Sequence, residues 1–246
     1  MKLLTQYSSR KSWIAIADDA DESDLVRRIR STDIILSDLD KTDAYPGREV
    51  ALSFLTNGRN ILDRKFWNWA GTAGYLLYLE GKQAYNNVVL SFANLFVKTP
   101  SELTRIRKKY QESYVLTTFY PAVLDFYSAF PKALKIYVTR NIKEIATAYA
   151  AGAHFNYAMP EQYDKKSAVD IIHQEFPDKK QYLVRGDTIE DQAMAQRLKE
   201  IKDDKSIDDV VYINVAFNKR NMNQIADINT SRNQTALAEW VKGKVY

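Results

Sequence analysis

Residues 34–42 read IILSDLDKT, an apolar run of three residues that leads into a polar stretch with two aspartates. Two later segments have the same form: residues 136–138 (IYV) lead to Thr139, and residues 182–184 (YLV) lead, after two residues, to Asp187. Short apolar runs that end abruptly are typical of buried strands. The sequence therefore predicts three buried strands, each followed by a side chain that could take part in chemistry.

Helical patterns follow these strands at about 141–151, 165–175 and 189–201. From residue 134 onward the order is strand, helix, strand, helix, which favours an α/β fold with a parallel sheet and crossover helices. In such sheets ligands bind beyond the carboxyl ends of the strands. We therefore expect the polar residues at the three strand ends to meet in one crevice, although they are far apart in sequence.

The remaining parts of the chain give weaker patterns. A helix is predicted from about Glu22 to Arg30, and a further strand at about 210–215. A short strand at Ile225 to Ile228 and a closing helix at about 233–242 complete the prediction.

Residues 46–130 have helical periodicity without convincing strands. Thr99, Pro100 and Glu102 mark one helix start, with the threonine as N-cap and the glutamate three residues after it. The segment is too long for a loop and is interpreted as a helical subdomain inserted into a core made of residues 1–45 and 131–246. Most of its aromatic rings are expected to pack inside it, and one or two could face a substrate: Phe66, Trp67, Trp69, Tyr75, Tyr78, Tyr85, Phe92 and Phe96.

Composition excludes several classes of function. The formal charge of +4 is spread over 35 basic and 31 acidic residues, and the longest basic cluster, 105–109, does not indicate nucleic-acid binding. Because the chain has no cysteine and only two histidines, a thiolate nucleophile and a zinc site of Cys or multiple His ligands are not expected. A catalytic metal would be held by oxygen, which favours Mg²⁺. The sequence shows neither a signal peptide nor a membrane span, so we expect a cytoplasmic protein without a membrane partner.

Four segments together resemble the motifs of the haloacid dehalogenase (HAD) superfamily. Residues 38–42 have the form Asp-x-Asp-x-Thr of the first motif, and residues 186–191 have the form Gly-Asp-x-x-x-Asp of the fourth. Thr139 matches the second motif, and Lys165 has the spacing expected of the third. The resemblance covers residues 33 to 191 and implies a Rossmann-like parallel core with helices on both faces, plus an all-helical class I cap.

The resemblance also implies roles for the four aspartates. Asp38 is expected to be the nucleophile that forms an aspartyl-phosphate. Asp38 and Asp187 would hold Mg²⁺ directly, the backbone carbonyl of Asp40 would complete the protein ligands, and Asp191 would support the site through water or hydrogen bonds. A strand-end aspartate can also serve only as a turn or a helix cap.

Asp40 distinguishes two branches of this superfamily. It is placed to protonate the departing alkoxide and then to take a proton from the hydrolytic water. A halide leaves without a proton, and the resemblance implies that dehalogenases lack this second aspartate. Its presence favours a phosphate ester as substrate.

Thr139 and Lys165 are expected to bind the phosphoryl group, the threonine by a hydrogen bond and the lysine by its charge. The choice of lysine stays open, because Lys166 is adjacent and Lys179 or Lys180 could reach the site from the far end of the helix.

Two positions depart from the family pattern: Lys41, where glycine is frequent, and Asp43, where a hydrophobic residue is common. Both charges are expected to face solvent, although they could tune substrate preference. His154 and His173 are expected at the surface or in packing roles.

The sequence thus predicts a Mg²⁺-dependent phosphomonoester hydrolase that acts on a small phosphorylated metabolite beneath the cap. The alternative is a HAD-fold binding or regulatory protein that has lost turnover. The identity of the metabolite and the oligomeric state are left open.

Overall fold

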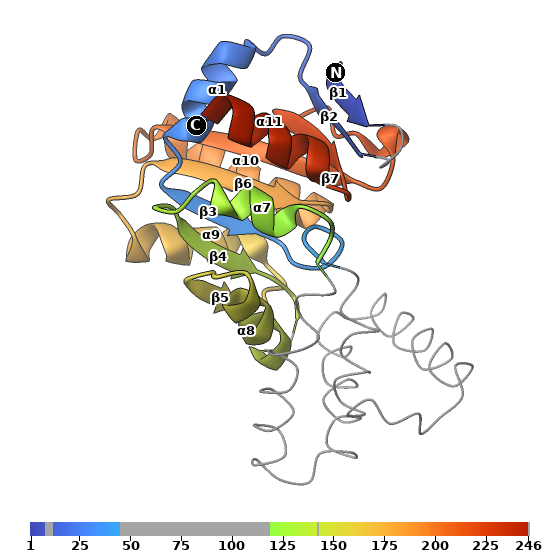
Figure 1. Cartoon of the computed structure of the whole chain (residues 1–246). Coiled ribbons are helices and arrows are strands. Elements are labelled where there is room, and N and C mark those ends of the chain that lie inside the picture. The colour runs from blue at the N-terminus through green and yellow to red at the C-terminus, as the bar shows by residue number, and fades with distance from the viewer. Residues whose placement is uncertain (8–11, 45–118, 142, 246) are drawn as a thin grey trace, which may run out of the picture.

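The structure is a computed structural model that describes residues 1–7, 12–44, 119–141 and 143–245. Within these residues an eight-stranded sheet runs through the molecule in the order β1-β2-β8-β7-β6-β3-β4-β5 (Figure 1). Its strands are β1 (Lys2–Tyr7), β2 (Ser12–Ile16), β3 (Ile34–Ser37), β4 (Leu134–Val138), β5 (Tyr157–Met159), β6 (Gln181–Gly186), β7 (Asp209–Ala216) and β8 (Ile228–Ser231).

The strands from β8 to β5 pair in parallel, as the strand–helix alternation predicts. β1 and β2 form an antiparallel hairpin, and β2 also pairs antiparallel with β8. The sheet is therefore mixed. The short strand predicted at 225–228 is wrong in position, because β8 begins where that prediction ends. The sequence patterns predict neither the hairpin nor β5.

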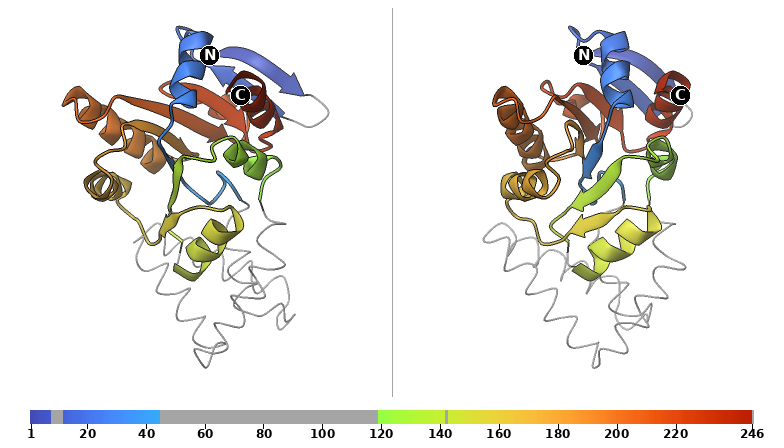
Figure 2. Two further views of the ribbon diagram at one scale, coloured as in Figure 1. Left: turned by 60° about the vertical axis from the view of Figure 1, so that its left-hand side comes forward. Right: turned by 90° about the vertical axis from the view of Figure 1, so that its left-hand side faces the viewer.

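Helices cover both faces of the sheet, which confirms the predicted architecture (Figure 2). α9 (Lys165–Glu175) and α10 (Ile189–Asp203) pack on one face. The other face carries α1 (Glu22–Arg30), α7 (Val123–Ser128), α8 (Lys143–Gly152) and α11 (Thr235–Val245), and a 3-10 helix at Lys219–Asn221 follows β7.

Strand β3 shows why this chain forms a two-sided core. Side chains alternate between the faces of a strand. Ile34 and Leu36 lie in the cluster under α9 and α10, whereas Ile35 lies in the cluster under the helices of the other face. All three side chains are fully buried, so the unbroken apolar run is what a strand with helices on both sides requires.

Residues 119–130 pack with the core, although the sequence pattern assigns them to the helical insert. Phe126 and Tyr127 of α7 are buried in the same cluster as Trp240 of α11, and Phe119 forms an antiparallel bridge with Ala44. The rest of the predicted insert, with its helix start at Thr99, lies outside the described residues.

No described helix is both long enough and apolar enough to cross a membrane.

Candidate active site

The register of the sheet brings the predicted site residues to one edge. Ser37, the last residue of β3, is level with Tyr137 on one side and with Arg185 on the other. Because the three strands are parallel, the residues that follow them leave the sheet at the same end. The Asp38 N–H donates to the Arg185 carbonyl at 3.0 Å, which fixes Asp38 beside the start of the Gly186–Asp187 turn.

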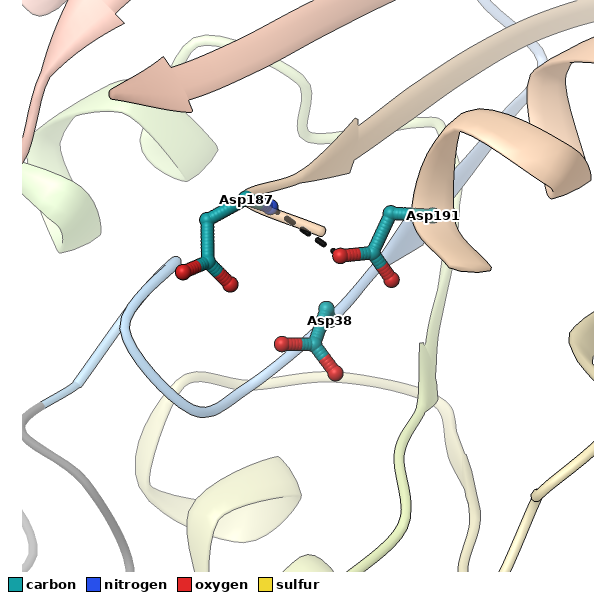
Figure 3. Close-up of side chains that lie close together, drawn as sticks. All are labelled: Asp38, Asp187 and Asp191. Carbon is teal, nitrogen blue, oxygen red and sulfur yellow. Dashed lines mark hydrogen bonds between the residues drawn. The ribbon is translucent and has the colours of Figure 1, made fainter. Parts of the chain in front are cut away.

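Three carboxylates meet at this edge: Asp38 after β3, Asp187 after β6 and Asp191 in the first turn of α10 (Figure 3). Each offers an oxygen atom, and these atoms lie within 4.8 Å of one another. Asp38 is 6% exposed and Asp191 is fully buried. Buried carboxylates this close repel one another unless a cation joins them, so the cluster is suited to bind positive charge.

Lys165 supplies one such charge. Its Nζ lies 2.6 Å from Asp38 Oδ1 and 2.5 Å from Asp191 Oδ1, and its side chain is almost fully buried. Asp164 caps α9 by accepting from the N–H groups of Lys166 and Ser167, which places Lys165 at the first helical position.

Of the alternatives that the sequence left open, none reaches the cluster. Lys166 is exposed. Lys179 pairs with Asp178, and Lys180 donates to the Ser206 carbonyl. Lys165 is therefore the lysine at the carboxylates.

Both carboxylate oxygens of Asp191 have hydrogen-bond partners. One oxygen contacts Lys165, and the other accepts from the N–H groups of Asp187 and Thr188 and from the Thr188 hydroxyl. This is a capping box at the start of α10. Gly186 makes the arrangement possible, because a Cβ atom there would lie 2.0 Å from the Cβ of Asp191.

Burial and crowding shift the pKa values of the cluster. Burial raises the pKa of Asp38 well above its ordinary value; Lys165 opposes the shift, and the other three aspartates add to it. Burial, with the charge of Asp191, raises the pKa of Asp187 to about 7. Burial alone would lower the pKa of Lys165, but Asp191 and Asp38 outweigh it and raise the pKa.

The donor set fits a hard divalent cation. The atoms are carboxylate oxygens, Asp38 and Asp191 are buried, and among the described residues Lys165 is the cation within hydrogen-bonding distance of any of the three acids. Oxygen ligands and excess negative charge are what Mg²⁺ requires. Since both oxygens of Asp191 are already engaged, Asp38 and Asp187 are the acids with free coordination capacity, and Asp191 is suited to a supporting position.

The other predicted site residues lie around the cluster. The Thr42 hydroxyl is 3.5 Å from carboxylate oxygens of both Asp38 and Asp187. Thr139 is buried, and its hydroxyl accepts from the Asn141 N–H at 3.2 Å. Asp40 is half-buried in the turn after Asp38, close enough for its charge to raise the pKa of that carboxyl. These contacts thus bring Asp38, Lys165, Asp187 and Asp191 together and connect Thr139 to its own loop instead of to the carboxylates.

The turn after Asp38 is compact. The Lys41 N–H donates to the Ala44 carbonyl at 2.8 Å, and the Asp43 and Ala44 N–H groups both donate to the Leu39 carbonyl. Lys41 has φ of 62°, a left-handed conformation that glycine adopts without strain. This explains in physical terms why glycine would be favoured at position 41.

The expectation that Asp43 faces solvent is wrong. Asp43 and Arg185 are both fully buried, and Arg185 Nη1 lies 2.7 Å from Asp43 Oδ1. The hydroxyl groups of Tyr127, Tyr137 and Ser37 donate to the second oxygen of Asp43. A buried charge is tolerated only when it is paired and hydrogen-bonded, and Asp43 has both kinds of partner.

This buried pair also joins the turn after Asp38 to the far end of the chain. Arg185 Nη2 donates to Gln234 Oε1, and Gln234 Nε2 donates to the Thr42 carbonyl at 2.7 Å. The guanidinium of Arg185 also lies over the Phe126 and Tyr127 rings. We name Asp43, Arg185, Tyr127, Tyr137, Ser37 and Gln234 the buried polar network.

Sequence reasoning missed Arg232, which follows β8 at the same edge of the sheet. Its Nη2 lies 3.8 Å from Asp187 Oδ2. The signal that could have found it was a cation directly after a strand end, but that strand was predicted three residues too early. Neither histidine reaches the carboxylates: His154 is exposed, and His173 is half-buried beside the Tyr182 hydroxyl.

No family model matches the sequence, and no curated protein matches it. Solved structures do. A protein of Burkholderia xenovorans LB400 that is assigned to the haloacid dehalogenase-like hydrolases is 13% identical, with a TM-score of 0.55 over 87% of this chain and 99% of that one. A HAD-hydrolase of Bacillus subtilis bound to magnesium is 15% identical, with a TM-score of 0.49 over 79% and 92%. CbbY from Rhodobacter sphaeroides, in complex with phosphate, is 13% identical, with a TM-score of 0.46 over 84% and 98%.

The first of these similarities covers most of this chain and almost all of the other, with a TM-score above 0.5. The chain therefore has the fold of the haloacid dehalogenase-like hydrolases.

Proposed function

We propose that this protein is a Mg²⁺-dependent phosphomonoester hydrolase that acts through an aspartyl-phosphate on Asp38. The observation that supports the proposal best is the convergence of Asp38, Asp187 and Asp191 with Lys165 at the carboxyl edge of the sheet. The substrate we propose is a small phosphorylated metabolite.

A phosphate monoester is a dianion, so an attacking carboxylate is repelled until positive charge lies between them. Bound Mg²⁺, held by Asp38 and Asp187 and supported by Asp191, would supply that charge. Lys165 contributes a second, fixed cation. Its contact with Asp38 Oδ1 holds the carboxylate in place and leaves Oδ2 to act as the attacking atom.

In the first step Asp38 Oδ2 forms a bond to phosphorus, and the bond between phosphorus and the ester oxygen breaks. Asp40, as the neutral acid, gives its proton to the departing alkoxide. In the second step Asp40, now a carboxylate, takes a proton from water while the water oxygen attacks phosphorus. The bond from Asp38 to phosphorus breaks, inorganic phosphate leaves, and both aspartates return to their initial states.

The test is hydrolysis of para-nitrophenyl phosphate by the whole protein with and without Mg²⁺. Asp38→Asn should abolish turnover, and Asp40→Asn should reduce kcat about 10²- to 10⁴-fold. Asp125→Asn, on an exposed surface of α7, is the matched control and should retain wild-type activity. An acid-quenched reaction should contain phosphate bound covalently to the wild type and none bound to Asp38→Asn.

Turnover retained in Asp38→Asn would refute the role of the nucleophile. If folded, Mg²⁺-loaded wild type hydrolysed no member of a broad panel of phosphate esters, the proposal of an active hydrolase would fail, and the alternative of a catalytically silent binding protein would take its place.

A further inference from the structure

We infer that Arg232 binds a second anionic group on the substrate, so that the protein prefers phosphate esters whose leaving group carries a carboxylate or another phosphate. This inference rests on the proposed function. It begins from the position of the residue: β8 pairs in parallel with β7, and Ser231 is level with Ala216. Arg232 therefore leaves the sheet at the same end as Asp187.

The guanidinium is held close to the carboxylate cluster. Its Nη2 lies 3.8 Å from Asp187 Oδ2, which is close enough for an ion pair and too long for a hydrogen bond. Its Cζ lies 4.9 Å from the centroid of the Phe217 ring and 5.9 Å from that of the Tyr120 ring. Contacts with aromatic faces restrict the orientation of a guanidinium, so Arg232 has a preferred position before any ligand binds.

Arg232 has donor capacity that the described residues do not use. Its Nε is buried and has no hydrogen-bond partner among them, and its side chain is 24% exposed. Leaving a buried donor unpaired is costly. An arginine presents its N–H groups as a planar fork that matches a carboxylate or a phosphate, so an anionic group is the acceptor that suits this position.

Two other cations at this edge have acid partners at shorter distances. Lys165 is held between Asp38 and Asp191, and Arg140 Nη1 lies 3.4 Å from Glu190 Oε1. Arg232 differs because the acid beside it, Asp187, is one that the proposed function assigns to the metal. A bound metal would neutralise the charge of Asp187 and leave the Arg232 guanidinium available to the substrate. Asp187 would then lie between Arg232 and the proposed nucleophile, Asp38.

The experiment compares two matched pairs of substrates: carboxymethyl phosphate and 2-carboxyethyl phosphate, each against its neutral amide. Wild type should have a lower KM for the acids than for the amides. Arg232→Gln should raise KM for the acids roughly 10- to 100-fold, the usual effect of losing a charge-assisted hydrogen bond, and leave both constants for the amides nearly unchanged. Arg232→Lys keeps the charge without the fork and should give an intermediate KM.

Arg220→Gln is the matched control, because Arg220 is an exposed arginine in the 3-10 helix after β7. It should leave the preference for acids intact. Equal losses on acids and amides in Arg232→Gln would overturn the inference, because they would mean that Arg232 acts only on Asp187 or on the transferred phosphoryl group.

A binding measurement separates this inference from the proposed function. The dissociation constant of 2-carboxyethylphosphonate, which cannot be hydrolysed, is measured by calorimetry beside that of its amide. Weaker binding of the acid alone in Arg232→Gln would support the inference even if no ester were turned over. Unchanged binding of the acid would contradict it even if the phosphatase activity were established.

Discussion

Asparagine in place of Asp43 should destabilise the fold, because it leaves the Arg185 guanidinium buried without a negative partner. Both side chains are fully buried, and their charged atoms lie 2.7 Å apart. Burial raises the pKa of Asp43, and Arg185 and three hydroxyl donors oppose that shift. The variant keeps the shape of the side chain, but it removes the charge and replaces one acceptor oxygen by an NH2 group that meets donors from Arg185 or from the hydroxyls.

The size of the effect follows from two opposing contributions. Removing one partner of a buried ion pair costs about 3–5 kcal/mol. The side-chain carbonyl of the introduced asparagine still accepts one hydrogen bond from the Arg185 guanidinium, weaker than the ion pair, which returns about 1 kcal/mol. The expected net loss is about 2–4 kcal/mol. For a chain of this length that corresponds to a fall in Tm of about 5–15 °C.

Urea unfolding followed by circular dichroism, together with a thermal scan, measures this loss. The matched control is Asp125→Asn, which removes the acid of an exposed pair with Lys242. Such pairs contribute about 0–1 kcal/mol, so the control should unfold close to wild type. In a double-mutant cycle, Asp43→Asn and Arg185→Met together should cost about 1–3 kcal/mol less than the sum of the single losses.

A stability of Asp43→Asn within about 0.5 kcal/mol of wild type would refute the reasoning, since it would mean that Asp43 is already neutral in the folded protein. Strict additivity in the cycle would contradict it independently.

Three further predictions concern the carboxylate cluster. Without metal, the free energy of unfolding should fall as the pH rises from about 4 to 7, because the pKa of Asp187 is raised from 3.8 to about 7 in the folded state. In this range the folded protein binds a proton that the unfolded chain has lost. The loss of stability should be at most about 4 kcal/mol, and urea titrations across this range measure it. Gly186→Ala should cost about 1–3 kcal/mol or more and reduce turnover, because the new Cβ would overlap Asp191. Lys165→Met should lower kcat at least about 100-fold, whereas Lys166→Met, at an exposed neighbour, should leave it unchanged in the same steady-state assay.

Each of these predictions has a control. Saturating Mg²⁺ should reduce the pH dependence of stability, and a flat profile in its absence would show that Asp187 titrates normally. Gly243→Ala changes an exposed position of α11 with nothing within 4 Å and should stabilise the protein by about 0.5–1 kcal/mol. A loss of stability in this variant comparable to that of Gly186→Ala would point to a general sensitivity to substitution. Equal activity losses in the two lysine variants would argue against a specific contact of Lys165 with Asp38.

Local patterns predict the centre of this fold well. The runs at 34–36, 136–138 and 182–184 are continuous and apolar because helices cover both faces of the strands that contain them, and that is the condition under which a short apolar run identifies a strand. Asp38 and Asp187 lie close together because the residues that follow the carboxyl ends of neighbouring parallel strands lie at the same edge of the sheet.

Features that depend on distant partners could not be predicted in this way. β8 has the sequence Ile-Asn-Thr-Ser, which lacks an apolar pattern, yet all four residues are buried. Asn229 accepts from the Asn214 side chain, and the Thr230 hydroxyl donates to the Trp13 carbonyl. Polar residues of this kind are satisfied by neighbouring strands that lie far away in sequence. A local pattern does not contain that information.

Asp43 is the clearest example. In the sequence it is a charge in a turn, and a charge in a turn usually faces solvent. Its partner Arg185 lies 142 positions further along the chain, and only the parallel pairing of β3 with β6 brings the two together. Arg232 was missed for a related reason, because the polar sequence of β8 hid the strand end that it follows.

The places where the chain leaves and re-enters the described core lie next to each other. Ala44 bridges Phe119, and the Tyr120 N–H donates to the Asp43 carbonyl at 2.8 Å. Because these contacts fix both ends at one place, the described core can accept inserted segments of very different length at a cost that rises only slowly with length. The intervening sequence is therefore a position where segments can be exchanged, in evolution or by design, without a change in the strand pairing of the core.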